Sequence, residues 1–204
     1  FTGRLGKGHV FGYEDDEYNS PTRTAQLGRI RVTEVEQVRH GAMPGRWLDV
    51  GAGTGYVLRE ARSRGWQVQA VETNQHGVDT LQRQQIPVIV TPWEKANIAD
   101  ASQDVVSFYT VLQHLSDPNV ALRKARRVLK ADGLLVIRAD DFSSLNPATA
   151  GTLLPLSARD IQYYFTAESL SALLQKNGFE VIDMKEAGQG VSGQNRMINV
   201  LNHG

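Results

Sequence analysis

Short apolar stretches alternate regularly with segments of helical periodicity between residues 46 and 138. The strand-like stretches are residues 46–50, 67–72, 87–91, 104–109 and 134–138, and the helical segments are residues 56–64, 77–85 and 120–129. Strands that alternate with helices of about ten residues are typical of βαβ units, which build a parallel sheet covered by helices on both faces. The pattern therefore predicts an α/β fold with a Rossmann-like, doubly wound sheet.

A separate helix precedes this alternation. Apolar side chains recur at helical spacing over residues 23–40, and residues 41–45, which include Pro44, break the pattern. We therefore divide the chain into an N-terminal cap or lid segment with its helix, residues 1–45, and a main domain, residues 46–204.

A long irregular stretch, residues 140–161, interrupts the alternation. Such an insertion in an α/β domain is more often a binding loop or lid than a linker. Beyond it, Thr166 and Ser169 predict a capping box for a helix over residues 167–176. Residues 179–185 and 196–201 read as two strands, which we expect to pair as a hairpin.

The first strand runs into a glycine turn, Asp49-Val50-Gly51-Ala52-Gly53-Thr54-Gly55. Glycines permit positive φ and let a ligand approach the backbone, and the helix that follows offers free N–H groups. A dinucleotide fingerprint would require glycine at position 56, where Tyr56 stands. Because Asp49 suits an α-ammonium group, the turn favours S-adenosylmethionine over NAD. The alternative is a turn that only packs strand against helix.

An acidic residue ends the next predicted strand, and its distance from the glycine turn along the sequence suits a role in ribose binding. Glu72 follows Gly53 by 19 residues. An acid about 20 residues beyond such a turn lies over the cofactor ribose and accepts hydrogen bonds from its hydroxyls. The alternative is a solvated charge at the end of a strand.

Several motifs now appear in order, and together they resemble class I S-adenosylmethionine-dependent methyltransferases. They comprise residues 48–55, 71–72, 104–106, 111–118 and 127–133, and residues 163–181 resemble the C-terminal segment of a branch rich in bacterial small-molecule enzymes. The resemblance spans about residues 46–200. It implies a seven-stranded sheet whose last strand is antiparallel, with S-adenosyl-L-methionine as cofactor and S-adenosyl-L-homocysteine as product.

The resemblance also implies a set of cofactor-binding residues. Gly51, Ala52 and Gly53 would line the methionine portion, and Glu72 would hold the ribose. The remaining members of the expected set are Asp49, Thr73, Asn74, Trp93, Glu94, Tyr109 and Thr110. The family often has an acid where Pro92 stands, so Glu94 or a backbone N–H must replace it. Trp93 either stacks on adenine or belongs to the core.

Three polar residues are candidates for catalysis. His114 follows strand 104–109, and Asp140 and Asp141 follow strand 134–138, so all three fall at the sheet edge where ligands bind. His114 would be a general base or an anchor of the loop beside the cofactor. The aspartates would orient or deprotonate an amine or hydroxyl, or form a solvated turn. His114 could also be a metal ligand, as in the ubiquinone-pathway O-methyltransferases, whose similar motif has a Glu beside the His. Because Gln113 replaces that Glu here, we expect no metal.

Composition restricts the kinds of partner that the protein can bind. Lys plus Arg and Asp plus Glu are 22 each, which argues against nucleic-acid binding, and the absence of Cys excludes thiolate metal sites. We expect a cytoplasmic monomer or homodimer, without membrane or nucleic-acid partners, that methylates an O or N atom of a small-molecule acceptor. The alternatives are a cofactor-binding protein without transferase activity and a protein or RNA methyltransferase. The basic residues 123–127 read as a solvated helix face.

Overall fold

The computed structural model describes residues 20–142, 161–186 and 195–202. The helices are α1 (Pro21–Val38), α2 (Tyr56–Ser63), α3 (Gln75–Arg83), α4 (Pro118–Val128) and α6 (Ala167–Lys176), with short 3-10 helices η1 (Trp93–Lys95) and η2 (Leu112–His114). The strands are β1 (Arg46–Val50), β2 (Gln67–Val71), β3 (Val88–Ile89), β4 (Gln103–Tyr109), β5 (Leu129–Asp140), β6 (Phe179–Glu186) and β7 (Asn195–Asn202).

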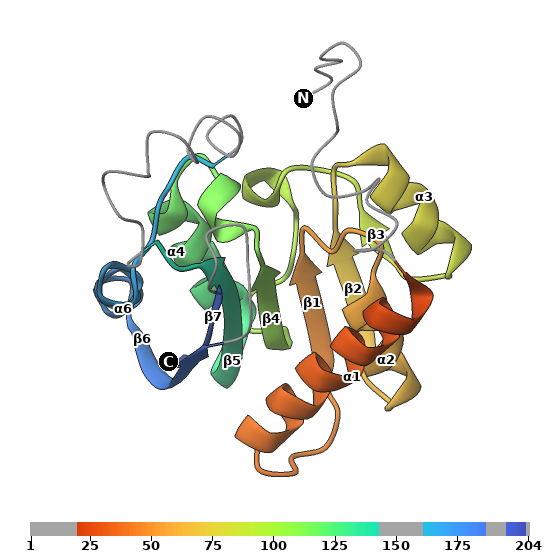
Figure 1. Cartoon of the computed structure of the whole chain (residues 1–204), viewed down its shortest axis with the longest axis horizontal. Coiled ribbons are helices and arrows are strands. Elements are labelled where there is room, and N and C mark those ends of the chain that lie inside the picture. Colours follow the sequence, from red (N-terminus) through yellow and green to blue (C-terminus); the bar gives the residue numbers. More distant parts are fainter. Residues whose placement is uncertain (1–19, 143–160, 187–194, 203–204) are drawn as a thin grey trace.

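All these strands belong to one sheet in the order β3-β2-β1-β4-β5-β7-β6. The strands from β3 to β5 run parallel to their neighbours, and β7 is antiparallel to both β5 and β6. The strand order reverses between β1 and β4, and ligands bind beyond the carboxyl ends of the strands at such a switch point. Figure 1 shows this sheet as the central layer, with helices on both sides. The predicted Rossmann-like α/β fold is confirmed.

Alternate side chains of the strands fill two separate cores. Trp47 of β1 packs with α1, α2 and α3, while its neighbour Leu48 packs with α4 and α6 on the opposite face. This alternation follows from the two-residue period of a strand. Asp49 is therefore on the same face as Trp47, under α1 and α2.

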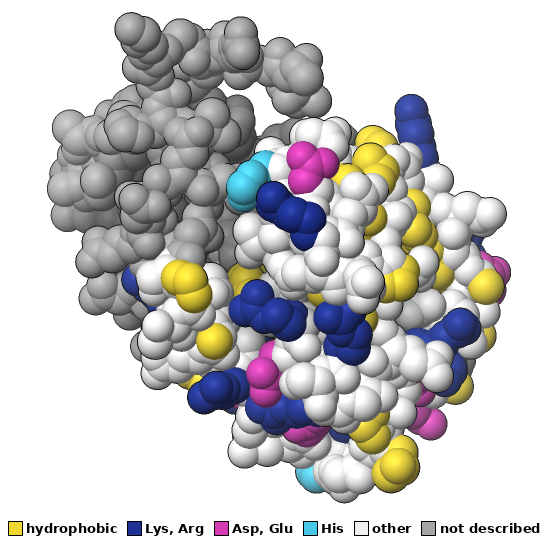
Figure 2. Space-filling model, turned by 90° about the vertical axis from the view of Figure 1, so that its right-hand side faces the viewer, with side chains coloured by type: hydrophobic (Ala, Val, Ile, Leu, Met, Phe, Trp, Pro, Cys, Tyr) yellow, Lys and Arg dark blue, Asp and Glu magenta, His cyan; other side chains and the backbone are white. Residues whose placement is uncertain are grey.

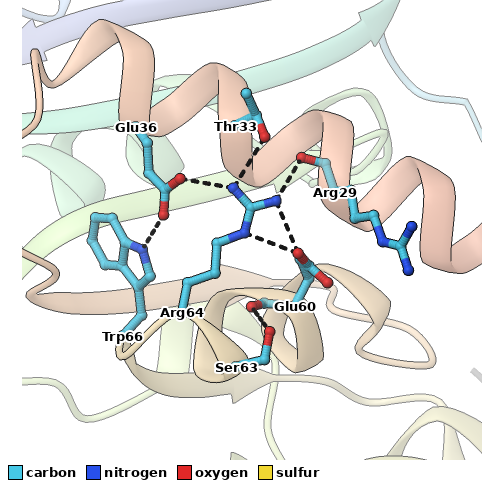
Figure 3. A network of polar contacts seen from close by, with 7 residues as sticks. All are labelled: Arg29, Thr33, Glu36, Glu60, Ser63, Arg64 and Trp66. Atoms are coloured by element: carbon cyan, nitrogen blue, oxygen red, sulfur yellow. Dashed lines mark hydrogen bonds and ion pairs between the residues drawn. The ribbon is translucent and has the colours of Figure 1, made fainter.

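Helix α1 is attached firmly to α2. Ser20 caps its first turn by accepting a hydrogen bond from the Arg23 backbone N–H, and Pro21 begins the helix. At the far end of α2, Arg64 donates to Glu36 at 2.8 Å and to Thr33 at 3.0 Å, both on α1. Figure 3 shows this guanidinium between the two helices, where it also contacts Glu60 of α2.

The expected elements are found within a few residues of their predicted ends, except around β5. Strand β5 begins at Leu129 rather than at the predicted residue 134, and Asp132 inside it has a positive φ of 60°. The pairing with β4 shifts between Gln103 and Val105, so β5 accommodates extra residues without breaking. The predicted hairpin of the last two strands is confirmed by the β6–β7 pairing. Most of the predicted insertion at 140–161, and residues 1–19 of the predicted cap, lie outside the described residues.

The charges on the visible surface are mixed. On the face in Figure 2, Lys and Arg side chains are spaced apart, with acidic and uncharged side chains between them. Within the described residues, no helix is long and apolar enough to cross a membrane.

Candidate active site

The glycine turn connects β1 to α2 at the carboxyl edge of the sheet. Gly51, Gly53 and Gly55 have φ values of 67°, 55° and 71°. A Cβ on Gly51 would lie 2.5 Å from Val111, so the loop after β4 touches the turn closely. Gly55 is the left-handed N-cap of α2 and provides no side-chain cap. The backbone geometry therefore requires glycine here, as the sequence predicted.

Glu72 ties the end of β2 to this turn. Its side chain is 6% exposed, and one carboxylate oxygen accepts from the Gly53 N–H at 2.7 Å. The other oxygen accepts from the N–H groups of Thr73 at 2.7 Å and Asn74 at 2.8 Å. A carboxylate offers about four acceptor positions, so capacity remains for a hydroxyl group.

The two residues after Glu72 begin α3. Asn74 is its N-cap and accepts with its side-chain oxygen from the N–H groups of His76 and Gly77. Thr73 is exposed beside it. Both lie at the carboxyl edge, next to Glu72, where the adenosine portion was expected.

Asp49 is buried below the turn, with an exposed fraction of 2%. It accepts a hydrogen bond of 2.6 Å from the Ser107 hydroxyl, which in turn accepts from the Trp47 indole N–H at 2.9 Å. Burial raises the pKa of Asp49 to about 7, opposed by the Ser107 hydrogen bond and by the charge of Arg31. Asp49 therefore titrates near neutrality.

Trp93 belongs to the hydrophobic core. Its side chain is 2% exposed, its indole N–H donates to the Ala121 carbonyl, and its ring packs edge-on against Phe108. Such burial leaves no ring face for adenine and contradicts the stacking hypothesis. Glu94 is exposed on the next position.

Lys124, a residue of α4, holds the segment around Trp93 in place. Its ammonium donates to the carbonyl oxygens of Trp93 and Ala96 at 2.5 Å each and lies over the Trp93 ring. Desolvation by burial lowers the pKa of Lys124. The prediction of a solvated basic face is therefore wrong for Lys124, although Arg123, Arg126 and Arg127 are exposed.

The end of β4 carries the last two residues expected on the cofactor side, Tyr109 and Thr110. Tyr109 is 9% exposed, and Thr110 has a positive φ of 62°, which is strained for a β-branched residue. Thr110 is held by a backbone hydrogen bond of 2.8 Å to the Arg138 carbonyl. Arg31 of α1 lies over the Tyr109 ring, and sequence reasoning missed it. The signal was a basic residue within the apolar stripe of Leu27, Val32 and Val35.

The three catalytic candidates lie at or just beyond the carboxyl ends of β4 and β5. Asp140 is 3% exposed and accepts from the buried Gln113 side chain at 3.0 Å. Asp141 is also buried, whereas His114, next to Gln113, is exposed. The two aspartates therefore do not form the solvated turn considered as an alternative. Within the described ranges, no three potential metal ligands cluster.

Comparison with known proteins identifies the family. The sequence model of the methyltransferase domain matches residues 29–184, more than half of the chain. The chain belongs to the S-adenosylmethionine-dependent methyltransferase family. S-adenosylmethionine is the cofactor of that family.

The known proteins that this chain resembles are distant from it in sequence. A probable S-adenosylmethionine-dependent methyltransferase of Mycobacterium tuberculosis is 27% identical over 67% of this chain and 49% of its own length. An uncharacterized protein of Methanocaldococcus jannaschii is 28% identical over 88% of this chain and 80% of its own length. The chain spans about half the length of the mycobacterial relative.

A solved structure shows the same fold with ligands. The 1,6-didemethyltoxoflavin N1-methyltransferase of Burkholderia thailandensis, with 1,6-didemethyltoxoflavin and S-adenosylhomocysteine bound, matches with a TM-score of 0.68. It is 18% identical, and the match covers 89% of this chain and 79% of that chain.

The residues of the methyltransferase site fit this cofactor. Glu72 has acceptor capacity for a ribose hydroxyl, and the turn at residues 51–55 presents backbone with positive φ. Asp49 supplies a buried carboxylate beneath the turn, suited to an ammonium group.

Proposed function

We propose that this protein transfers the methyl group of S-adenosylmethionine to an oxygen or nitrogen atom of a small molecule. The main observation in favour of S-adenosylmethionine binding is the carboxylate of Glu72, which joins the end of β2 to the glycine turn through the Gly53 N–H. The small molecule bound in the Burkholderia structure supports a small-molecule acceptor.

In this proposal, the bound cofactor supplies an electrophilic methyl group on a sulfonium. Glu72 accepts from ribose hydroxyls, Asp49 faces the α-ammonium group, and the turn at residues 51–53 lines the amino-acid end. Thr73, Asn74, Glu94 and Thr110 surround the rest of the cofactor. Positioning the acceptor in line with the methyl can lower the barrier by about 7–11 kcal/mol. A general base is needed only where the nucleophile must lose a proton.

The acceptor binds on the β4–β5 side of the edge. Asp140 and Asp141 orient its amine or hydroxyl, and His114 is placed to take a proton where the nucleophile must lose one. The buried Gln113 side chain fixes Asp140, which supports a positioning role for this carboxylate. Residues 1–45 act as a cap, and residues 140–161 form the acceptor-side insertion.

Calorimetry with S-adenosylhomocysteine tests the cofactor site. We expect binding at micromolar concentrations, loss of binding in G53V because the branched side chain intrudes on the ligand, and about tenfold to hundredfold weaker binding in E72Q, since hydrogen bonds to a charged group contribute about 1.5–3 kcal/mol. The matched control is E168Q on α6, which removes an exposed carboxylate far along the chain. Wild-type affinity in both site variants would refute the assignment.

Transfer of a labelled methyl group tests the acceptor class. The purified protein is incubated with labelled S-adenosylmethionine and panels of small amines, phenols and acids, and separately with RNA and protein extracts. Labelling of a small molecule supports the proposal. Labelling of macromolecules alone, or tight cofactor binding with no labelled product, favours one of the alternative functions instead.

A further inference from the structure

Residues 161–165, which lead into α6, lie against the loop that follows β4. The backbone N–H groups of Gln162 and Tyr163 donate to the Gln113 carbonyl at 2.9 Å and 3.2 Å. The Gln162 side chain also donates to the His114 carbonyl at 3.4 Å. These hydrogen bonds place the segment beside a catalytic candidate, on the acceptor side of the proposed site.

The same segment is joined to the chain that leaves β5. Phe165 forms a parallel bridge with Asp141, and its carbonyl oxygen accepts from the Phe142 N–H at 2.9 Å. Asp141 and its neighbour Asp140 are the carboxylates proposed to orient the acceptor. The segment is therefore bonded to both loops that carry proposed acceptor residues.

Two of the three consecutive aromatic residues in this segment belong to the core. Phe165 is buried with side chains of α4 and α6, and Tyr163 packs against them. The two rings stack with their centroids 6.2 Å apart, and the Tyr163 hydroxyl donates to the Ser116 carbonyl at 2.9 Å. Because Tyr163 and Phe165 share one side of the chain, Tyr164 between them points to the other side.

Tyr164 meets Phe142 on that other side. Their ring centroids are 4.7 Å apart and the ring planes cross at 83°, an edge-to-face contact. Val136 of β5 packs in the core beneath α1 and α2, and alternation along the chain places Asp140 and Phe142 on the same face. Tyr109 of β4 also packs on that face. The aromatic pair, Phe142 and Tyr164, therefore shares a face with a residue expected beside the cofactor.

The aromatic pair is fixed in position but keeps accessible surface. Tyr164 is 41% exposed, and Phe142 is half-buried. A ring that is already held by an edge-to-face contact loses little conformational freedom when a ligand packs against it. Contact between aromatic rings favours a planar ligand over a saturated ligand of the same size by about twofold to tenfold.

We propose that Phe142 and Tyr164 form an aromatic surface that binds the acceptor, and that the acceptor carries its reactive nitrogen or oxygen on or beside a planar ring. This assignment rests on the proposed function and names the acceptor class within it. An ammonium group over the Tyr164 ring would be a different use of the same surface. The carboxylates of Asp140 and Asp141 already suit a positive charge, so the rings are left for the body of the acceptor.

Saturation-transfer NMR on the protein loaded with S-adenosylhomocysteine tests the ring preference. The probes are two matched pairs at millimolar concentration, benzylamine with cyclohexylmethylamine and phenol with cyclohexanol. Each pair keeps the amine or hydroxyl and replaces the planar ring by a saturated ring. We expect each ring-bearing probe to bind about twofold to tenfold more tightly than its saturated counterpart. Y164L and F142L should abolish this preference, whereas Y164F, which keeps the ring, should retain it.

Y163F is the matched control, because it changes the neighbouring tyrosine that packs into the core. Loss of its hydrogen bond to Ser116 should lower the melting temperature and leave the ring preference unchanged. Equal binding within both pairs, no binding of either ring-bearing probe, or an unchanged preference in Y164L would overturn the aromatic assignment. Loss of S-adenosylhomocysteine binding in Y164L would also overturn it, whereas a wild-type protein that does not bind S-adenosylhomocysteine would refute the proposed function.

Discussion

Asp49 shows how one residue can couple the cofactor site to protein stability. Its carboxyl is buried between β1 and β4, and its two neighbours there, Trp47 and Ser107, form a chain of hydrogen bonds that ends on it. These hydrogen bonds satisfy one oxygen of the Asp49 carboxylate, but neither partner carries a positive charge. Burial therefore dominates, and the pKa of Asp49 rises to about 7.

This shift predicts a pH dependence of stability. Because the folded-state pKa lies above the unfolded value of 3.8, the stabilising contribution is complete below about pH 4 and is lost as the pH rises through about 7. D49N has no titrating group here. The free energy of unfolding of D49N, relative to that of wild type, should therefore increase between pH 4 and pH 8 by up to about 4 kcal/mol. Urea unfolding at several pH values measures this difference.

D79N provides the comparison for that experiment. Asp79 is exposed on α3, where it accepts a hydrogen bond from the Gln75 side chain. Its pH profile should run parallel to that of wild type. A D49N profile that also ran parallel would contradict the burial of a titrating carboxyl at this position.

Roles that depend on backbone geometry were easier to predict from the sequence than roles that depend on side-chain packing. Glu72 and the glycines were recognisable because their spacing follows from strand and helix lengths. Lys124 and Arg31 were not, because a basic residue in a helical repeat gives no sign of which surface will cover it. Trp93 had two possible roles, and only the position of α4 against η1 decides between them.

At the scale of elements, local capping signals were the most reliable predictions. Helix α6 begins and ends at its predicted residues, and Thr166 and Ser169 form the expected capping box. The predicted start of a strand at residue 134 was wrong, since β5 already begins at Leu129 and continues after a shift in its pairing with β4. That outcome depends on a neighbouring strand, which local sequence does not specify.

The crossing of α1 over α2 depends on one glycine. A Cβ at Gly28 would lie 2.8 Å from the Tyr56 carbonyl oxygen and 3.3 Å from the Glu60 Cβ. G28A should gain up to about 1 kcal/mol of helix propensity but lose about 1–3 kcal/mol through overpacking. We expect a net loss of stability in urea unfolding, together with weaker S-adenosylhomocysteine binding, because Tyr56 begins the helix at the glycine turn.

An exposed position on the same helix gives the control for G28A. Q26A adds no contact, so its free energy of unfolding should stay within about 0.5 kcal/mol of wild type. Should G28A prove as stable as Q26A, the close approach of the two helices would not be a constraint on the fold.

At the scale of the whole molecule, the glycine turn, Glu72 and the catalytic candidates meet because the sheet reverses its strand order at β1 and β4. The residues come from segments far apart in the chain, and parallel strands bring their carboxyl ends to one edge. Helix α1 contributes Arg31 to the same edge from outside the alternating core. The boundary at residue 45, proposed from sequence, therefore separates segments that share a core and a site.

A truncation tests whether α1 is an independent cap or part of the domain. A chain that starts at Gly45 loses Val32 and Val35, both fully buried against the Trp47 core, and loses the partners of Arg64 on α1. Each buried valine contributes about 1.5–3 kcal/mol, a large share of the stability of a domain of ordinary size. We expect this chain to unfold at lower urea and to bind a hydrophobic dye, whereas a chain that starts at Asn19 keeps every described contact of α1. Equal unfolding midpoints for the two truncated chains would show that α1 is a separable cap, as the sequence suggested.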